Sequence, residues 1–348
     1  MPFELQPGSS DLLLPTLEDG APDHPYTVHT YYFGFSIPEA GIGAYLYFRA
    51  QPRFGLCQGG PVIFRGLDNP MGLDALHHDY RATMPWPTRE GNLLRVDNGY
   101  SIEWVEPGEL ARLRYASPDG QVGFELEQRA VTPLLARGHI VPGEDDHHDG
   151  IASSAGGSEQ FMHVTGELRV RGERWDVDCH AVRDRSWNQV RTEEPGGARP
   201  MAPLGWTPIY LGPDLAFNAT SFEASDSDPA WKGIVDMPEG TDRKPVYAWV
   251  VRDGEPRHLT SVRREVHEYH PILLSAIRQT VEAEDEKGDT YRFSGEAIAA
   301  CPAHSWPNIG FRDSVFRWTD DHGRVAHCTY QEIFYDQYVR GVRDRTSR

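Results

Sequence analysis

Apolar and polar residues alternate along most of this chain with the period of two that marks β-strands. The stretches 27–35 and 42–48 are rich in aromatic and β-branched residues, and every second residue from Trp175 to Cys179 is apolar. Segments of this kind, about 6–9 residues long, are typical of strands with one buried face. The pattern therefore predicts a chain built almost entirely from β-structure with little helix.

Short turn sequences separate these segments and predict hairpins. They lie at residues 106–108, 118–120, 171–173, 287–289 and 321–323. Helix is scarce: residues 70–80 could form one short helix, whereas the segment that starts at Pro271 is interpreted as a strand because it runs straight into the turn at Lys287. Strands joined by tight turns favour a β-sandwich or an up-and-down β-barrel.

The stretch from residue 143 to residue 159 is polar, rich in glycine and serine, and without an apolar period. Such a composition is typical of a linker or loop. With 348 residues the chain is long enough for two domains, so we expect one over residues 1–155 and another over residues 156–348. We also expect residues 143–157 to be mobile and dispensable for folding, because they can bury little apolar surface.

The charge and hydropathy of the chain argue against nucleic acids and membranes as partners. The chain has 34 Lys and Arg against 52 Asp and Glu, a formal net charge of -18. An acidic protein repels phosphates at long range, so nucleic acid and anionic membrane surfaces are poor partners. The N-terminus has no signal-peptide pattern and no apolar run is long enough to span a membrane. We therefore expect a soluble, cytoplasmic protein.

Cysteine and histidine spacing gives no reason to expect a metal. The four cysteines lie far apart without a CxxC pair, so we expect free thiols in place of a zinc site, an iron–sulfur cluster or a disulfide scaffold. The pairs His77-His78 and His147-His148 contain ligand types, but adjacent side chains point apart. They are interpreted as solvated loop residues, with a divalent ion at the acidic loop as the weaker alternative.

The densest group of chemically active residues is HAVRDRSWNQVR, residues 180–191. A carboxyl group shielded by apolar walls can act as a proton donor, whereas a carboxylate beside an arginine stays ionised. Two interpretations remain open. Asp184 is a proton donor at the mouth of a cavity, or Arg183 and Asp184 form a structural pair that fixes the strand end, with Trp187 in the core.

The run EQFMHVTGELRVRGERWDVDCHAVRDRSWNQVR, residues 159–191, resembles the central motif of the carotenoid 1,2-hydratase (hydroxyneurosporene synthase) superfamily, where a hairpin precedes Arg-Asp-His-Ser-Trp-Gly. Residues 29–49 are similar to its opening strand pair, and residues 316–334 to its closing hairpin. Four motif positions match: Arg183, Asp184, Ser186 and Trp187. Three positions differ: Arg185 replaces the motif His, Asn188 the Gly, and His29 a Glu common in the first strand.

The resemblance implies two consecutive lipocalin-like β-barrels. It also implies an enzyme without an organic cofactor that acts on a lipophilic terpenoid, steroid or polyketide-like substrate. The reaction would be hydration or dehydration, isomerisation or cyclisation. Asp184 is then the expected proton donor, oriented by Arg183. The expected substrate-binding residues are Trp187, Tyr31, Phe33, Phe35 and His180.

Other functions fit the same sequence. A carrier or sensor could bind a lipophile without converting it, and Arg185 in place of the motif His favours this or a different substrate. A β-sandwich that binds or cleaves glycans is a further alternative, because tryptophans and carboxylates are abundant. A second titratable group beside Asp184 would favour the enzyme.

Overall fold

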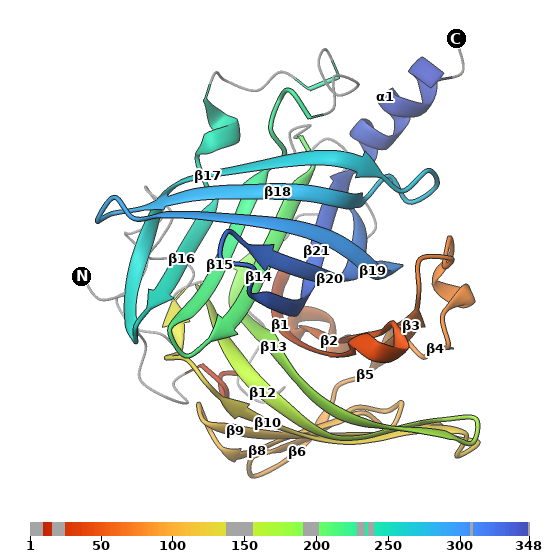
Figure 1. The fold of residues 1–348 in the computed structure, drawn as a ribbon. Coiled ribbons are helices and arrows are strands. Elements are labelled where there is room, and N and C mark those ends of the chain that lie inside the picture. Colours follow the sequence, from red (N-terminus) through yellow and green to blue (C-terminus); the bar gives the residue numbers. More distant parts are fainter. Residues whose placement is uncertain are drawn as a thin grey trace. The chain divides into compact units, whose positions relative to one another are not determined.

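The computed structural model describes residues 10–15, 25–136, 156–190, 202–227, 234–235, 240–306 and 309–346. Most of these residues lie in β-strands, which confirms the predicted all-β class (Figure 1). The chain forms two compact units. We call residues 1–64 together with 75–191 the N-terminal unit, and residues 65–74 together with 192–348 the C-terminal unit.

The N-terminal unit contains one antiparallel sheet of 13 strands. These strands are β1 (Thr27–Ile37), β2 (Ile42–Gln51), β3 (Leu56–Arg65), β4 (His77–His78), β5 (Arg81–Pro85), β6 (Thr88–Glu90), β7 (Leu93–Arg95), β8 (Ser101–Glu106), β9 (Leu110–Ala116), β10 (Val122–Ala130), β11 (Leu135–Ala136), β12 (Gly156–Val170) and β13 (Glu173–Val190). Their order is β4-β3-β2-β1-β13-β12-β10-β9-β8-β7-β6, with β5 beside β3 and β11 beside β12. Within the described residues this path does not close, so the unit is a curled half-barrel where a closed barrel was expected.

An apolar core fills one face of this sheet. Tyr31, Phe33 and Phe35 of β1 point into it, together with Val177 and Cys179 of β13. These residues follow the strand period of two that the sequence shows. All 11 residues of β1 are buried, so its other face is covered as well.

The C-terminal unit contains a closed, antiparallel eight-stranded barrel. Its strands follow one another around the barrel in chain order: β14 (Leu204–Gly212), β15 (Leu215–Phe222), β16 (Tyr247–Arg252), β17 (Glu255–Tyr269), β18 (Ala276–Asp285), β19 (Thr290–Trp306), β20 (Ile309–Asp320) and β21 (Val325–Tyr335). This is the up-and-down arrangement of lipocalins. Helix α1 (Asp336–Thr346) follows the last strand.

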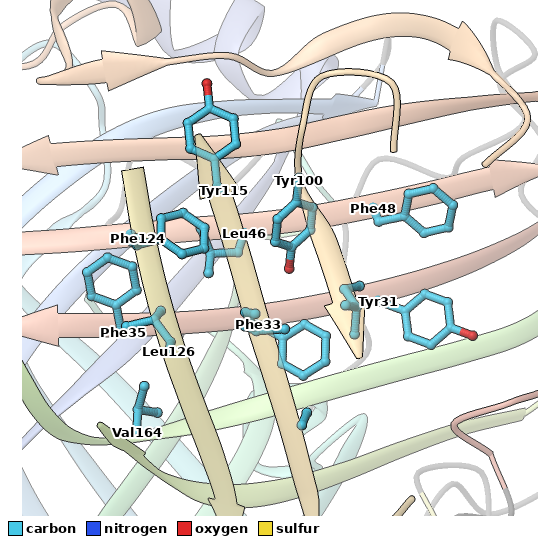
Figure 2. Packing of buried hydrophobic residues seen from close by; sticks show 14 of the residues in the cluster. Tyr31, Phe33, Phe35, Leu46, Phe48, Tyr100, Tyr115, Phe124, Leu126 and Val164 are labelled. Atoms are coloured by element: carbon cyan, nitrogen blue, oxygen red, sulfur yellow. The ribbon is translucent and has the colours of Figure 1, made fainter. Parts of the chain in front are cut away.

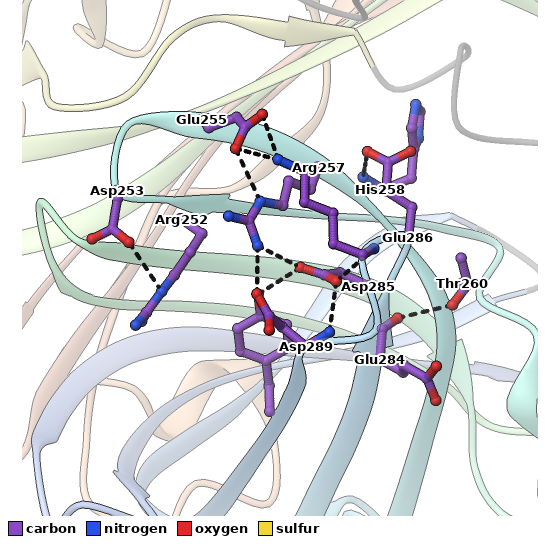
Figure 3. Close-up of polar contacts among 12 residues, drawn as sticks. Arg252, Asp253, Glu255, Arg257, His258, Thr260, Glu284, Asp285, Glu286 and Asp289 are labelled. Carbon is purple, nitrogen blue, oxygen red and sulfur yellow. Dashed lines mark hydrogen bonds and ion pairs between the residues drawn. The ribbon is translucent and has the colours of Figure 1, made fainter.

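Ion pairs join two hairpins at one end of the barrel (Figure 3). The Arg257 guanidinium, on β17, lies 3.0 Å from Asp285 Oδ2 and 2.7 Å from Asp289 Oδ2. Asp285 also accepts a hydrogen bond of 2.8 Å from the hydroxyl of Tyr291. Although burial alone raises the pKa of Asp285, the hydrogen bonds from Tyr291 and Arg257 hold it below its usual value. These contacts fix the β18–β19 turn against β17.

The division between the units differs from the expected one. Strands β12 and β13 lie in the middle of the N-terminal sheet, so this unit continues to Arg191 and the chain is not divided at residue 155. The segment 65–74 belongs to the C-terminal unit, where Asn69 Nδ2 donates to the carbonyl of Ala300 at 3.0 Å. The loop 143–157, expected to be mobile, lies outside the described residues except for its last two glycines.

The structure confirms all five predicted hairpin turns, which connect β8 to β9, β9 to β10, β12 to β13, β18 to β19 and β20 to β21. The strand expected after Pro271 is β18. The short helix expected over 70–80 is wrong: only a single 3-10 turn, η4 (Gly72–Asp74), forms there. Helix α1, which begins directly after β21, was not predicted from the sequence.

In the described part of the chain, no helix is long and apolar enough to cross a membrane.

Candidate functional site

The motif residues lie at the end of β13, between β1 and β12. Side chains along a strand alternate between its two faces. Arg183 and Arg185 share the core face with Ala181, whereas Asp184 points to the opposite face. The motif therefore supplies polar groups to both faces of the N-terminal sheet.

On the core face, Arg183 binds the carboxylate of Asp11. Arg183 Nη1 and Asp11 Oδ1 are 2.5 Å apart, and the Arg183 and Asp11 side chains are 4% and 0% exposed. The amide of Gly108 donates to the other oxygen of Asp11 at 2.7 Å. Gln160 Oε1 accepts from Arg183 Nε at 2.9 Å and from Nη2 at 2.7 Å. The guanidinium of Arg183 is thus held on the side of the sheet away from Asp184.

Arg185 lies beside this pair without a carboxylate partner among the described residues. Its guanidinium carbon lies 4.0 Å from the centre of the Tyr31 ring, and Nη1 donates to the carbonyl of Thr30 at 3.1 Å. Burial lowers the pKa of Arg185 from its ordinary value. Burial, and then the charge of Arg185, lower the pKa of His29 to about 3, so this imidazole is neutral at physiological pH.

The aromatic residues predicted to bind substrate are packed in the core. Tyr31, Phe33 and Phe35 are at most 2% exposed and lie among the other core side chains, as Figure 2 shows. A cavity of about 10 Å³ adjoins Tyr31 and Trp104. It has room for about one water molecule, so a lipophile could enter only if neighbouring side chains moved.

On the opposite face, Asp184 has a carboxylate neighbour. Glu159 of β12 is its partner across the strands, and Tyr32 of β1 is its partner on the other side. Side chains in such register are about 4.5–5.5 Å apart at Cβ. Glu159 is fully buried, while Asp184 is half-buried. The register therefore makes Glu159 and Asp184 cross-strand neighbours on this face of the sheet.

Tyrosines extend this face across the sheet. The ring of Tyr32 lies 5.6 Å from that of Tyr45 on β2. Tyr45 and Tyr47 stack at 5.4 Å, and Tyr80 stacks on Tyr47 at 6.5 Å. Asp184 thus adjoins a row of aromatic rings, of which Tyr32, Tyr45 and Tyr47 are buried, at most 8% exposed.

Two predicted site residues lie elsewhere. His180 stacks on its cross-strand partner His163, with ring centroids 5.0 Å apart, four residues along β13 from Asp184. At about 3.3 Å per residue that is roughly 13 Å. Trp187 is 1% exposed and covers Gly156, where a Cβ atom would lie 2.3 Å from its ring. Arg183 does not contact Asp184, so its predicted orienting role has no support in the geometry.

The sequence did not predict that Glu159 and Asp11 belong to the site. Glu159 could have been found, because Glu159 and Asp184 each lie eleven residues from the turn pair Val170–Glu173 and are therefore cross-strand partners. Asp11 could not have been found in this way, since it is 172 residues from Arg183 in the chain.

The C-terminal unit holds a second buried polar cluster, around Arg264. Arg264 Nη1 donates to Glu332 Oε1 and to the Tyr330 hydroxyl, each at 2.9 Å, and Glu332 Oε2 accepts from the Ala276 amide at 2.7 Å. Arg264 and Glu332 are both 0% exposed. Burial alone lowers the pKa of Arg264, but Tyr330 and Glu332 raise it above its ordinary value. Glu332 is therefore a core residue.

Metal-binding geometry is not found among the described residues: no three His, Cys, Asp or Glu side chains gather around one point. His77 and His78 lie on β4, where the His77 ring contacts the Tyr115 hydroxyl at 2.7 Å. His147 and His148 lie outside the described residues.

A family model described as "Domain of unknown function (DUF7064)" matches residues 19–332. The chain belongs to the DUF7064 family. The matched range includes Glu159 and Asp184. It also includes the buried polar groups around Arg183 and Arg264, apart from Asp11. No curated protein matches the sequence.

One similar solved structure is the crystal structure of kievitone hydratase from Nectria haematococca. It is 12% identical in sequence, with a TM-score of 0.46, over 97% of this chain and 98% of that chain. Similarity at this level carries no argument about activity.

Proposed function

We propose that this DUF7064 protein is an enzyme that performs acid–base chemistry on a lipophilic substrate without an organic cofactor. The observation that carries the proposal is the Glu159–Asp184 pair, two carboxyl groups in register on neighbouring strands. It supplies the second titratable group that distinguishes an enzyme from a carrier. The resemblance of residues 159–191 to the carotenoid 1,2-hydratase superfamily supports the same reaction class.

Two neighbouring carboxyl groups can serve as the donor and the acceptor of one proton transfer. The half-buried Asp184 is the member that a substrate can reach, while Glu159 is fully buried behind it. In a hydration, the acid gives its proton to an alkene carbon and water adds to the cation. The added water then returns a proton to the carboxylate, which restores the pair.

The tyrosine row beside the pair supports a lipophilic substrate. Aromatic faces bury apolar surface and stabilise a nearby cation through their ring electrons. Tyr32 is the ring nearest to Asp184 in register, and Tyr45 and Tyr47 continue from it. Dehydration, isomerisation and cyclisation would use the same two proton transfers.

The variant Asp184→Asn tests the proposal, because the amide keeps the size of the side chain but has no transferable proton. We expect turnover to fall on the order of 100-fold or more, with ligand binding and thermal stability retained. Asp176→Asn is the matched control, since Asp176 faces Glu167 across the same two strands but is exposed to solvent.

The assay incubates a lipid extract of the host with wild type and with each variant, and follows all compounds by liquid chromatography with mass spectrometry. A compound consumed by wild type and by Asp176→Asn, but not by Asp184→Asn, supports the proposal. Equal consumption by all three proteins contradicts it. Lipids that bind but are never converted would identify a carrier.

A further inference from the structure

The segment Ser10–Pro15 is inserted into the core side of the N-terminal unit. Ser10 and Asp11 are 0% and 1% exposed, and Leu14 belongs to the apolar core. Ser10 Oγ lies 2.9 Å from Ser158 Oγ, and the Tyr31 hydroxyl donates to the carbonyl of Asp11 at 2.9 Å. The segment therefore presents one carboxylate and two leucines, Leu12 and Leu14, to the interior of the sheet.

The site that receives this carboxylate has more positive charge than Asp11 neutralises. Arg183 and Arg185 are both buried there, and among the described residues Asp11 is the one carboxylate that contacts either guanidinium. Among the residues that the structure describes, Arg185 Nε has no hydrogen-bond partner. A buried cation without an ion-pair partner costs free energy, so an additional anion at this point is favoured.

Leu12 and Leu14 adjoin a cavity with room for about one water molecule. Leu12 and Leu14 line the cavity of about 10 Å³ together with Trp104 and Leu94. The indole N–H of Trp104 is buried and has no partner among the described residues. If the segment withdrew, its leucine side chains would vacate a pocket with apolar walls and a basic end.

We propose that the core side of the N-terminal unit is a binding site for a lipophilic carboxylic acid, and that Ser10–Pro15 occupies it as a built-in competitor. The acid's carboxylate takes the place of the Asp11 carboxylate on Arg183 and the Gly108 amide, within reach of Arg185. Its apolar body replaces Leu12 and Leu14. This site and Asp184 lie on opposite faces of β13, so the inference does not depend on the proposed function.

A competitor within the same chain reduces the apparent affinity by a factor equal to the fraction of time for which it leaves the site free. Fixing the segment in place should therefore abolish binding, and weakening it should increase binding. A disulfide between Ser10→Cys and Ser158→Cys would fix the segment, because the hydroxyl oxygens of the two serines are 2.9 Å apart. We call this disulfide the cysteine lock. The native cysteines are all buried, which limits competing disulfides.

The probe is 11-(dansylamino)undecanoate, a fluorescent lipophilic acid, with its methyl ester as the uncharged control. In the double cysteine variant we expect the acid to bind at least about ten-fold more weakly in the oxidised than in the reduced protein. The ester should show no such difference. Equal affinity of the acid in both redox states, or no binding to the reduced protein, would overturn the proposal.

The variant Asp11→Asn tests the competitor from the other direction. It releases Arg183 from its carboxylate partner, so the acid should bind at least about ten-fold more tightly than to wild type. Asp97→Asn is the control, because Asp97 belongs to the same unit but has a 58% exposed side chain. The same affinity in Asp11→Asn and Asp97→Asn would contradict the inference. The cysteine lock retains the Asp11–Arg183 pair and remains decisive if Asp11→Asn does not fold.

Discussion

Replacing Glu332 with Gln should destabilise the barrel strongly, because it removes the carboxylate that forms an ion pair with the fully buried Arg264 and leaves only the weaker attraction of Glu223 among the described carboxylates. Arg264 would retain its hydrogen bonds to the Tyr330 hydroxyl and to the carbonyl of Pro203. The Gln oxygen could still accept from the Ala276 amide, which now bonds to Glu332. Breaking a buried ion pair from one side costs about 3–5 kcal/mol, and the retained acceptor places this variant near about 3 kcal/mol.

The assay must report on the barrel alone, because a chain with two units need not unfold in one step. Hydrogen–deuterium exchange of peptides from β17 and β21 provides this, since it measures local opening. A loss of about 3 kcal/mol corresponds to a roughly 150-fold rise in the opening equilibrium. Exchange in β1 and β13 of the N-terminal unit should not change.

Glu282→Gln is the matched control, because Glu282 pairs with Arg292 at 2.6 Å in the same barrel but both side chains are about half exposed, at 44% and 53%. An exposed pair contributes about 0–1 kcal/mol, so this variant should raise the opening equilibrium by less than about six-fold. Equal effects of the two variants would refute the argument that burial determines the contribution of the Arg264 pair.

Two further predictions concern the N-terminal unit. The pKa of His29 is about 3 in the folded protein, against its ordinary value of 6.5. Between these two pH values the unfolded chain binds a proton at His29 and the folded protein does not. The free energy of unfolding therefore falls as the pH decreases. Urea unfolding at pH 6.5 and 4.5 should show wild type losing about 2 kcal/mol more than His29→Gln, and parallel losses would contradict the buried, neutral imidazole. Gly156→Ala would place a Cβ atom 2.3 Å from the Trp187 ring. We expect a loss of about 1–3 kcal/mol and a shifted tryptophan fluorescence spectrum; an unchanged melting temperature would show that the ring can move aside freely.

Local signals in the sequence were enough to predict the strands and hairpins. Alternation and turn residues act over a few positions, and each predicted turn connects two adjacent strands. The assignment of strands to units failed because it depends on long-range pairing. β1 pairs with β13, about 150 residues later, and no feature of residues 156–190 indicates that partner. The polar composition before β12 indicated a loop and was taken for a domain boundary.

The candidate site was predictable only in part, for the same reason. Counting from the turn at Arg171 pairs Asp184 with Glu159, so one carboxylate neighbour follows from hairpin geometry. The contact between Arg183 and Asp11 depends on how the N-terminal segment enters the sheet, which no local pattern indicates. Adjacent motif residues were expected to act together, yet strand alternation places Arg183 and Asp184 on opposite faces.

The central claim, that Asp184 transfers a proton to a bound lipophile, is tested most directly by what the protein carries when it is purified from its own host. Wild type and Asp184→Asn are isolated in parallel, and the bound small molecules are extracted and compared by liquid chromatography with mass spectrometry. We expect Asp184→Asn to retain an unconverted lipophile, which wild type converts to a separable product when the two are mixed. Identical bound molecules in both proteins, left unchanged by wild type, would contradict it.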